Sequence, residues 1–571
     1  MTSLGERVQG AQEMEEVLGS SKRWITLICA LGGGLAFLLL WTYLGFFQRV
    51  YVVGGLDQAY EVSIGGKNVK VPAHGWTTVK VSQGKVLLKS DSPFVKQEEF
   101  IVETPFLGRT GKTKTFVINP DGLGILEFKK NEYLAETIAR EHKEFPSVFH
   151  ANQVFYEFQE IDYPFKAFPS DLMMESEAEI KTGLELVEGY TPAEKLEGVA
   201  SHMGLVAAQS YALRQLEVEG FHPEAFAIMM NLFSEEKLLE FLKQYPPKGE
   251  EWVDWHLYST QIRTKLEPTI NLVPEYQKIA KENPDSGDAQ YILSTLVADS
   301  ESIEAYLEAS VRSPKPSGQG FRALTNRLLN SGRFDQALKL SDQARAILPD
   351  HPTFASERLL ASLALGKLKQ LEEAERKVLD ENPEDPEALH LLAEIAHCRG
   401  DYGQARSYTD KLAKKFPDRA LPLYREIAFF SGQTEEYEKL SEGDQVEQFH
   451  RDMRNDDVDF KETASPWVQL LGSLQVWSQG KKRFSEELRN QAVEQFKNGT
   501  PSERRLAADM DSKQAIVDAN LSSYQTATLL TLAAIRKPEL RAAYCPLAKK
   551  LCSIPVFPND LITRSLKKLD E

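Results

Sequence analysis

The spacing of hydrophobic residues changes along the chain and divides it into segments of different kinds. A polar tail, residues 1–23, precedes an uncharged stretch from Trp24 to Phe47. As a helix, this stretch would be about 36 Å long, which is enough to cross the hydrocarbon core of a bilayer. We therefore expect residues 24–47 to form a transmembrane helix, retained as a single-pass anchor because no small-residue cleavage site follows it.

The basic residues around this stretch predict its orientation. Arg7, Lys22 and Arg23 precede it, whereas Arg49 is the only basic residue in the 15 positions after it. The excess before the stretch predicts a cytoplasmic amino terminus and an extracytoplasmic soluble part. Small residues four apart would let two such helices approach closely, so a homodimer is a further expectation: Ala30 with Gly34, and Gly32 with Ala36.

From Arg49 the hydrophobic period becomes two, which is typical of half-buried strands. The alternating pairs are Val62 and Ile64, Val69 and Val71, Val79 and Val81, and Val86 and Leu88. Gly65-Gly66 and Gln83-Gly84 have the composition of hairpin turns. We expect a small, membrane-proximal, sandwich-like all-β domain over residues 48–175.

Two further features belong to this domain. Residues 131–144 predict a helix, whereas the aromatic residues Tyr163, Phe165 and Phe168 are expected either at the edge of the sheet or where the sheet packs against the solenoid. Residues 48–130 hold 12 basic and 8 acidic residues. Four lysines would contact anionic lipid if they face a membrane, and otherwise they only solvate the sheet: Lys67, Lys70, Lys80 and Lys85.

Helical periodicity begins at Pro192 and continues to the end of the chain. Within it, Gly332, Gly366 and Gly400 are spaced 34 residues apart, and so are Pro349, Pro383 and Pro417. A fixed period of this length indicates a repeated unit. The glycine falls between two amphipathic segments, so each unit is predicted to be helix, turn, helix.

This pattern resembles the tetratricopeptide repeat, in which small residues lie where paired helices touch. The clearest units are 318–351, with Ala337, Ala344 and Pro349; 352–385, with Gly366 and Pro383; and 386–419, with Ala393, Ala405 and Pro417. The middle unit has Leu359, Leu371 and Val378 where small residues are usual, so we expect its helices to lie further apart. Weaker copies extend the array over residues 192–450. The resemblance implies an α-solenoid whose inner surface holds a peptide or a partner helix.

The remaining residues predict a helical C-terminal domain over 466–571, covering the last repeat. Asn455 to Asp459 is interpreted as an acidic linker, since it lacks the spacing of a calcium loop. The predicted fold is therefore multidomain: a transmembrane helix, a β domain, an α-solenoid and a helical domain.

Composition narrows the classes of partner. The net charge of −17 disfavours nucleic acid, which needs a basic surface. Four cysteines do not form a disulfide framework. Cys545 and Cys552 would be roughly 10 Å apart on one helix, too far for a disulfide. Pro546 would permit one by breaking that helix, so free thiols and a disulfide both stay open.

The chain has no motif of a known active site: no phosphate-binding P-loop, no HExxH helix, no GxSxG elbow and no paired CxxC. Adjacent His397 and Cys398 face different sides of a helix, and Trp252, Trp255 and His256 are best explained by packing. We expect no catalytic, cofactor or metal residue. The sequence favours a non-enzymatic, membrane-anchored scaffold or assembly factor for protein partners. The alternative is a membrane-bound enzyme with its active site in the C-terminal helical domain.

Overall fold

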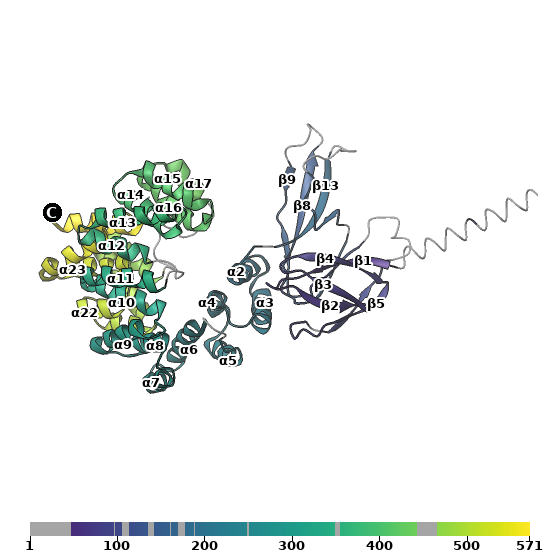
Figure 1. The fold of residues 1–571 in the computed structure, drawn as a ribbon, viewed down its shortest axis with the longest axis horizontal. Coiled ribbons are helices and arrows are strands. Elements are labelled where there is room, and N and C mark those ends of the chain that lie inside the picture. The colour runs from purple at the N-terminus through teal and green to yellow at the C-terminus, as the bar shows by residue number, and fades with distance from the viewer. Residues whose placement is uncertain are drawn as a thin grey trace, which may run out of the picture. The chain divides into compact units, whose positions relative to one another are not determined.

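The computed structural model describes Gly33 and residues 47–95, 97–104, 114–134, 142–159, 161–169, 178–187, 189–247, 251–348, 354–441 and 465–570. These residues fall into two compact units, and the boundary along the chain lies between Trp255 and His256. The first unit contains the β-sheets and a few helices, and the second is helical (Figure 1).

Two four-stranded sheets form the first part of unit one. One sheet has the order β11-β7-β1-β4 and the other β3-β2-β5-β6. Alternate residues of both, such as Val50, Ile64 and Leu88, are fully buried in one core, because successive side chains of a strand point to opposite faces. The β-sheets predicted here are confirmed. The strands are β1 (Phe47–Val53), β2 (Tyr60–Ile64), β3 (Lys67–Val71), β4 (Trp76–Ser82), β5 (Gly84–Lys89), β6 (Glu98–Val102), β7 (Thr115–Ile118) and β11 (Phe155–Phe158).

The two predicted turns differ in what they connect. Gly65 and Gly66 have φ of 55° and 78° and join β2 to β3 as a hairpin. Gln83-Gly84 does not make a hairpin, because β4 pairs with β1 while β5 pairs with β2 and β6. The chain passes there from one sheet to the other. Both strands bury alternate residues in the same core, so their local pattern cannot distinguish the two connections.

A third sheet has the order β10-β8-β13-β12, with β9 also paired to β8. Its strands are β8 (Leu126–Leu134), β9 (His142–Glu144), β10 (Val148–His150), β12 (Tyr163–Pro164) and β13 (Ala178–Leu186). The helix expected over 131–144 is wrong where the structure describes it. Pairing of β13 with β8 over nine positions outweighs local helix propensity. β13 also extends the β domain past the predicted boundary at residue 175.

The predicted transmembrane helix is not supported, and two predictions are corrected with it. No helix in the described part of the chain is long and apolar enough to cross a membrane. Of residues 24–47 only Gly33 and Phe47 are described, and Phe47 begins strand β1. The fold class is a β domain followed by a helical solenoid, and the localisation as a single-pass membrane protein is withdrawn. Residues 1–23, the small-residue pairs expected to mediate a homodimer, and Asn455 to Asp459 lie outside the described residues.

Helices α2 (Pro192–Met203), α3 (Leu205–Val218), α4 (Pro223–Leu232) and α5 (Glu235–Gln244) belong to unit one. Helix α2 begins where predicted: the Thr191 hydroxyl accepts from the Glu194 amide, and the Glu194 carboxylate accepts from the Thr191 amide. Helix α3 packs on the β domain, where the Tyr211 hydroxyl donates to the Leu123 carbonyl over 3.1 Å. These helices form one body with the sheets, although the sequence placed them with the solenoid.

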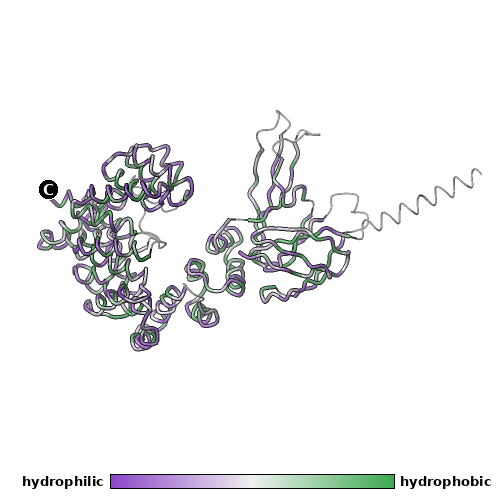
Figure 2. The backbone as a smooth tube through the Cα atoms, viewed as in Figure 1, coloured by the Kyte–Doolittle hydropathy of each residue, from purple (hydrophilic) through white to green (hydrophobic). Residues whose placement is uncertain are grey.

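Unit two is an array of helix pairs followed by a C-terminal group of helices. We call α7–α17 the array and α19–α25 the C-terminal helices. Hydrophobic and hydrophilic residues alternate along the helices, as amphipathic packing requires (Figure 2). The bounds are α6 (Trp252–Leu266), α7 (Val273–Glu282), α8 (Gly287–Leu296), α9 (Ser300–Arg312), α10 (Gly318–Ser331), α11 (Phe334–Ile347), α12 (Ala355–Ala364), α13 (Leu368–Glu381), α14 (Pro386–Cys398), α15 (Tyr402–Ala413), α16 (Pro417–Phe430), α17 (Thr434–Leu440), α19 (Pro466–Ser478), α20 (Lys482–Lys497), α21 (Pro501–Ala508), α22 (Lys513–Asp518), α23 (Ser523–Arg536), α24 (Arg541–Leu551) and α25 (Phe557–Asp570).

Candidate functional site

The glycines of the 34-residue repeat lie between the two helices of each pair. Gly332, Gly366 and Gly400 have φ of 85°, 69° and 74°, in the left-handed region that favours glycine. They separate α10 from α11, α12 from α13, and α14 from α15. The helix, turn, helix units predicted from the period are confirmed, and the chain has TPR-like repeats.

The small residues and prolines of the repeat occupy distinct places. The alanines are fully buried between helices: Ala337, Ala344, Ala393 and Ala405. Pro383 follows the end of α13, whereas Pro417 is the first residue of α16, where its missing amide hydrogen is not needed. Pro349 lies outside the described residues.

A weaker copy of the repeat shows the same turn. Asn283 ends α7 and Asn382 ends α13, and each carbonyl accepts from the amide three residues later, at 3.1 Å in both cases. Those later residues, Ser286 and Asp385, cap the next helix with their side chains. The array therefore begins before the clearest repeats.

The middle unit, in which the usual small residues are replaced, contains a buried charge. Glu375 on α13 is 1% exposed and accepts from Arg345 on α11 at 2.7 Å and from Arg358 on α12 at 2.9 Å. Arg358 also donates to Asp342 on α11 at 2.8 Å. These two arginine side chains link three consecutive helices.

The C-terminal helices pack against the first helices of the repeats. Helices α22, α23 and α24 contact α10, α24 also contacts α12, and α21 contacts α8. One hydrophobic core joins the two groups; its members include Phe321, Leu329 and Leu360 from the array and Leu530, Ala533 and Leu551 from the C-terminal helices. The sequence placed these helices over the last repeat, with the inner face left for a partner. Instead they cover the face formed by α8, α10 and α12.

The contact continues to later repeats through single residues. His397 on α14 donates from Nε2 to the Pro555 carbonyl over 2.8 Å, and the ring of Phe429 on α16 lies 6.4 Å from that of Phe557. Burial lowers the pKa of His397 and raises the pKa of Cys398 to about 12. His397 is thus buried and bound to the segment before α25, and Cys398 is partly buried beside it.

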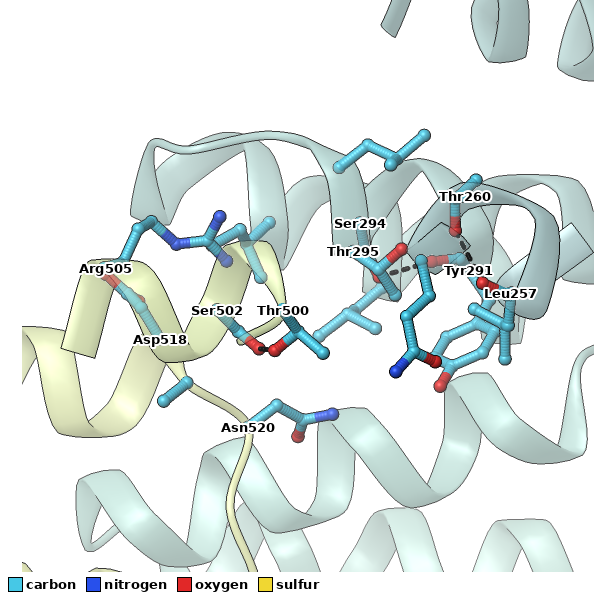
Figure 3. Close-up of a pocket in the computed structure, with 15 residues that line it drawn as sticks. Leu257, Thr260, Tyr291, Ser294, Thr295, Thr500, Ser502, Arg505, Asp518 and Asn520 are labelled. Carbon is cyan, nitrogen blue, oxygen red and sulfur yellow. Dashed lines mark hydrogen bonds between the residues drawn. The ribbon is translucent and has the colours of Figure 1, made fainter. Parts of the chain in front are cut away.

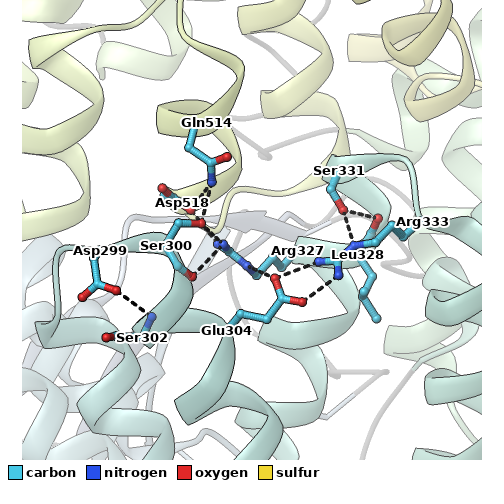
Figure 4. A network of polar contacts seen from close by, with 10 residues as sticks. All are labelled: Asp299, Ser300, Ser302, Glu304, Arg327, Leu328, Ser331, Arg333, Gln514 and Asp518. Atoms are coloured by element: carbon cyan, nitrogen blue, oxygen red, sulfur yellow. Dashed lines mark hydrogen bonds and ion pairs between the residues drawn. The ribbon is translucent and has the colours of Figure 1, made fainter.

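A network of charges fixes the C-terminal helices to the array (Figure 4). Arg327 on α10 is 3% exposed and donates from Nη1 to Asp518 on α22 over 2.8 Å. It also donates to Glu304 on α9 over 3.2 Å and to the Ser300 carbonyl over 3.1 Å. Glu304 accepts from Arg333 as well, at 2.6 Å and 3.0 Å, and Arg333 and Arg327 lower the pKa of Glu304.

Beside the end of α16, a groove of about 510 Å³ is lined by Phe430 and by residues of α24, α25 and the segment between them. Phe430, Ile554 and Pro555 give it apolar walls, while Lys567 and Asp570 lie at its rim. All lining residues except Phe430 come from α24, α25 and the segment between them. Nothing in the sequence pattern indicated this groove, because helical periodicity does not show how two helices pack on each other.

The cysteines of the C-terminal helices are free thiols. Cys545 lies within α24 and Cys552 directly after it. Pro546 lies inside the same helix without ending it. The two thiols therefore keep the helical separation that excludes a disulfide.

The lysines predicted to contact lipid lie on the strands of the β domain. Lys67 donates to the Lys80 carbonyl over 2.6 Å, and Lys85 pairs with Glu99 at 2.7 Å. Lys70 is exposed on β3. The lipid contact of these lysines stays a prediction. In the described part of the chain, no group of three or more His, Cys, Asp or Glu residues is placed to hold a metal ion.

Of the predicted aromatic cluster, Trp255 donates to the Leu242 carbonyl over 3.1 Å in unit one, and His256 Nδ1 lies 2.9 Å from the Tyr276 hydroxyl in unit two. Burial lowers the pKa of His256 from 6.5 to about 4. The unfolded chain therefore binds a proton between these values that the folded chain does not bind, and this destabilises the fold as the pH falls.

We predict that His256→Gln reduces the loss of stability of unit two between pH 6.5 and pH 4.5. The expected difference is about 1 kcal/mol, less than the full shift implies because the ring is only partly buried. Urea unfolding of both proteins at the two pH values measures it. An identical pH dependence of the wild type and the variant would contradict the assignment.

Comparisons with known proteins do not identify a family for this chain. No family model matches the chain, and no curated protein matches it. Among solved structures it is similar to one titled "Crystal structure of APC/C hetero-tetramer Cut9-Hcn1", with 12% identity and a TM-score of 0.24. That match covers 66% of this chain and 89% of the other. A TM-score this low carries no argument about fold or function.

Proposed function

We propose that the chain is a scaffold that binds protein partners through its TPR-like array. The observation that carries this proposal is the stack of helix pairs itself, since such stacks present extended surfaces that protein segments occupy. The enzyme alternative, with its active site in residues 466–571, is untested by the contacts described above.

The C-terminal helices restrict where a partner can bind. They already fill the face formed by α8, α10 and α12, so a partner on this face would have to displace a shared hydrophobic core. The groove beside Phe430 is open and has apolar walls with charges at its rim. An apolar core surrounded by polar groups is the usual anatomy of a protein interface. We assign the partner site to this groove.

A substitution that fills the groove tests this assignment. Ser553 is exposed, lines the groove and makes no side-chain contact that holds the fold together. Ser553→Trp should therefore block an inserted partner side chain while leaving the array intact. Deleting residues 318–419 is a poorer test, because those helices share their core with the C-terminal helices.

The experiment is affinity purification of the tagged full chain after mild crosslinking. We expect stoichiometric protein partners with the wild type, at least about tenfold less recovery with Ser553→Trp, and full recovery with Ser407→Trp, a control exposed on α15 outside the groove. If the wild type recovers no reproducible partner, the scaffold function is wrong. If Ser407→Trp alone loses the partner, the function stands but the groove does not.

A further inference from the structure

A cavity of about 270 Å³ lies in unit two, where the C-terminal helices meet α6, α8 and α9 (Figure 3). Ser502, Arg505 and Asn520 line it from the C-terminal helices. Most of the lining residues of α6 and α8 are also polar, Thr260 and Ser294 among them. The volume is near the lower end of the range for pockets that hold small ligands. The cavity therefore has room for a small polar molecule.

Arg505 on α21 is the unusual member of this wall. Among the described residues no hydrogen bond or ion pair is made by its side chain, and its Nε is buried without an acceptor. Burial lowers the pKa of Arg505, although Asp518 acts in the opposite direction. Asp518 Oδ1 accepts from Arg327 at 2.8 Å and from Gln514 at 2.9 Å. The Asp518 carboxylate thus accepts hydrogen bonds from Arg327 and Gln514 rather than from Arg505.

The charges around the cavity do not cancel without a ligand. Arg327 and Arg333 carry two positive charges, and Glu304 and Asp518 carry two negative ones, so this network is neutral by itself. Glu503, also on α21, accepts from the amide and the hydroxyl of Thr500 at 2.7 Å and 2.9 Å. Arg505 adds one positive charge that forms no ion pair with a described residue. A partly buried charge without a partner reduces the stability of the fold. A polar group that stays unpaired in a native structure therefore needs a specific explanation.

Hydroxyl and amide groups lie beside this charge. The hydroxyls of Thr500 and Ser502 are 3.1 Å apart at the start of α21. Asn520 has a φ of 51°, and its amide extends toward the cavity in Figure 3. Asn330 on α10 fixes this segment by donating to the Leu521 carbonyl over 2.7 Å. The backbone next to Asn520 is therefore fixed to α10.

We propose that this cavity binds a small oxyanion, a carboxylate or a phosphate, through the guanidinium of Arg505, with Ser502 and Asn520 as hydrogen-bonding neighbours. Arginine presents several donors in a plane that matches both groups. The chain has a net charge of −17 and so has no general attraction for anions. A bound anion would contact both the array and the C-terminal helices and hold them together.

Thermal unfolding of the full chain tests the proposal with inorganic phosphate and succinate as separate probes. Sodium chloride at matched ionic strength is the reference. We expect one or both probes to raise the Tm of the wild type saturably above that reference. A response to phosphate alone identifies a phosphate site, and a response to succinate alone identifies a carboxylate site. Arg505→Gln should weaken the response about 10- to 100-fold, the usual contribution of hydrogen bonds to a charged group.

Arg504→Gln is the matched control, because Arg504 is the neighbouring arginine on α21 and does not line the cavity. This variant should respond to the probes as the wild type does. Without a probe, Arg505→Gln should not lower the Tm, since the side chain removed has no partner to lose. The proposal is overturned if neither probe raises the wild-type Tm above the reference, or if Arg505→Gln responds like the wild type. Neither result depends on whether a protein partner binds.

Discussion

Replacing Arg327 with methionine should destabilise unit two by about 3–5 kcal/mol, as expected when one member of a buried ionic group is removed. The variant leaves Asp518 on α22 and Glu304 on α9 without their shared donor. It also removes the hydrogen bond to the Ser300 carbonyl. Chemical denaturation followed by circular dichroism measures the loss, provided that the transition of unit two is resolved from that of unit one.

Arg333→Met is the control for this prediction. Arg333 pairs with the same Glu304, but its side chain is 36% exposed and it does not reach the C-terminal helices. Its loss should cost about 1 kcal/mol or less, as for an exposed ion pair. If both variants lose the same stability, the network is not what fixes α22 to the array.

Glu375→Gln should have an effect of similar size, about 3–5 kcal/mol. The change keeps the shape of the side chain and removes the charge that compensates Arg345 and Arg358 in the middle repeat. Both arginines keep another acid, Asp385 and Asp342 respectively, but those carboxylates are more exposed than Glu375. The loss is read from the denaturation midpoint of unit two.

Glu373→Gln, two residues earlier on the exposed side of α13, is the matched control and should change stability by less than about 0.5 kcal/mol. A small effect of Glu375→Gln as well would mean that Arg345 and Arg358 reach water readily. In that case the ionic contacts would not be what holds α11, α12 and α13 together.

Features set by neighbouring residues could be predicted from the sequence. The glycines at 332, 366 and 400 predicted the helix pairs, because a left-handed turn leaves a local signal. The alternation of Val62 and Ile64 predicted a strand for the same reason. In contrast, the local pattern of residues 131–134 predicts a helix. This prediction is wrong because these residues pair with β13, about fifty positions away in the sequence.

The groove and the cavity could not be predicted from the sequence, because they depend on which helices contact each other. The period of a helix shows that it has an apolar face, but it does not show which helix that face will contact. The cavity beside Arg505 forms where the C-terminal helices fold back on earlier helices, and the groove beside Phe430 forms mainly between α24 and α25. The length and hydropathy of the stretch from Trp24 to Phe47 predict a transmembrane helix, and the described part of the structure does not support this prediction.

The core shared by α10 and the C-terminal helices also determines the order in which the protein can be built. Asn330 and its partner Leu521 are 191 positions apart, so α10 leaves the ribosome long before the helices that complete its core. Contacts this distant in sequence slow folding and leave apolar surface exposed in the meantime. The newly made array is therefore the stage at which this chain is most prone to aggregate. Products truncated before residue 466 should keep that liability permanently.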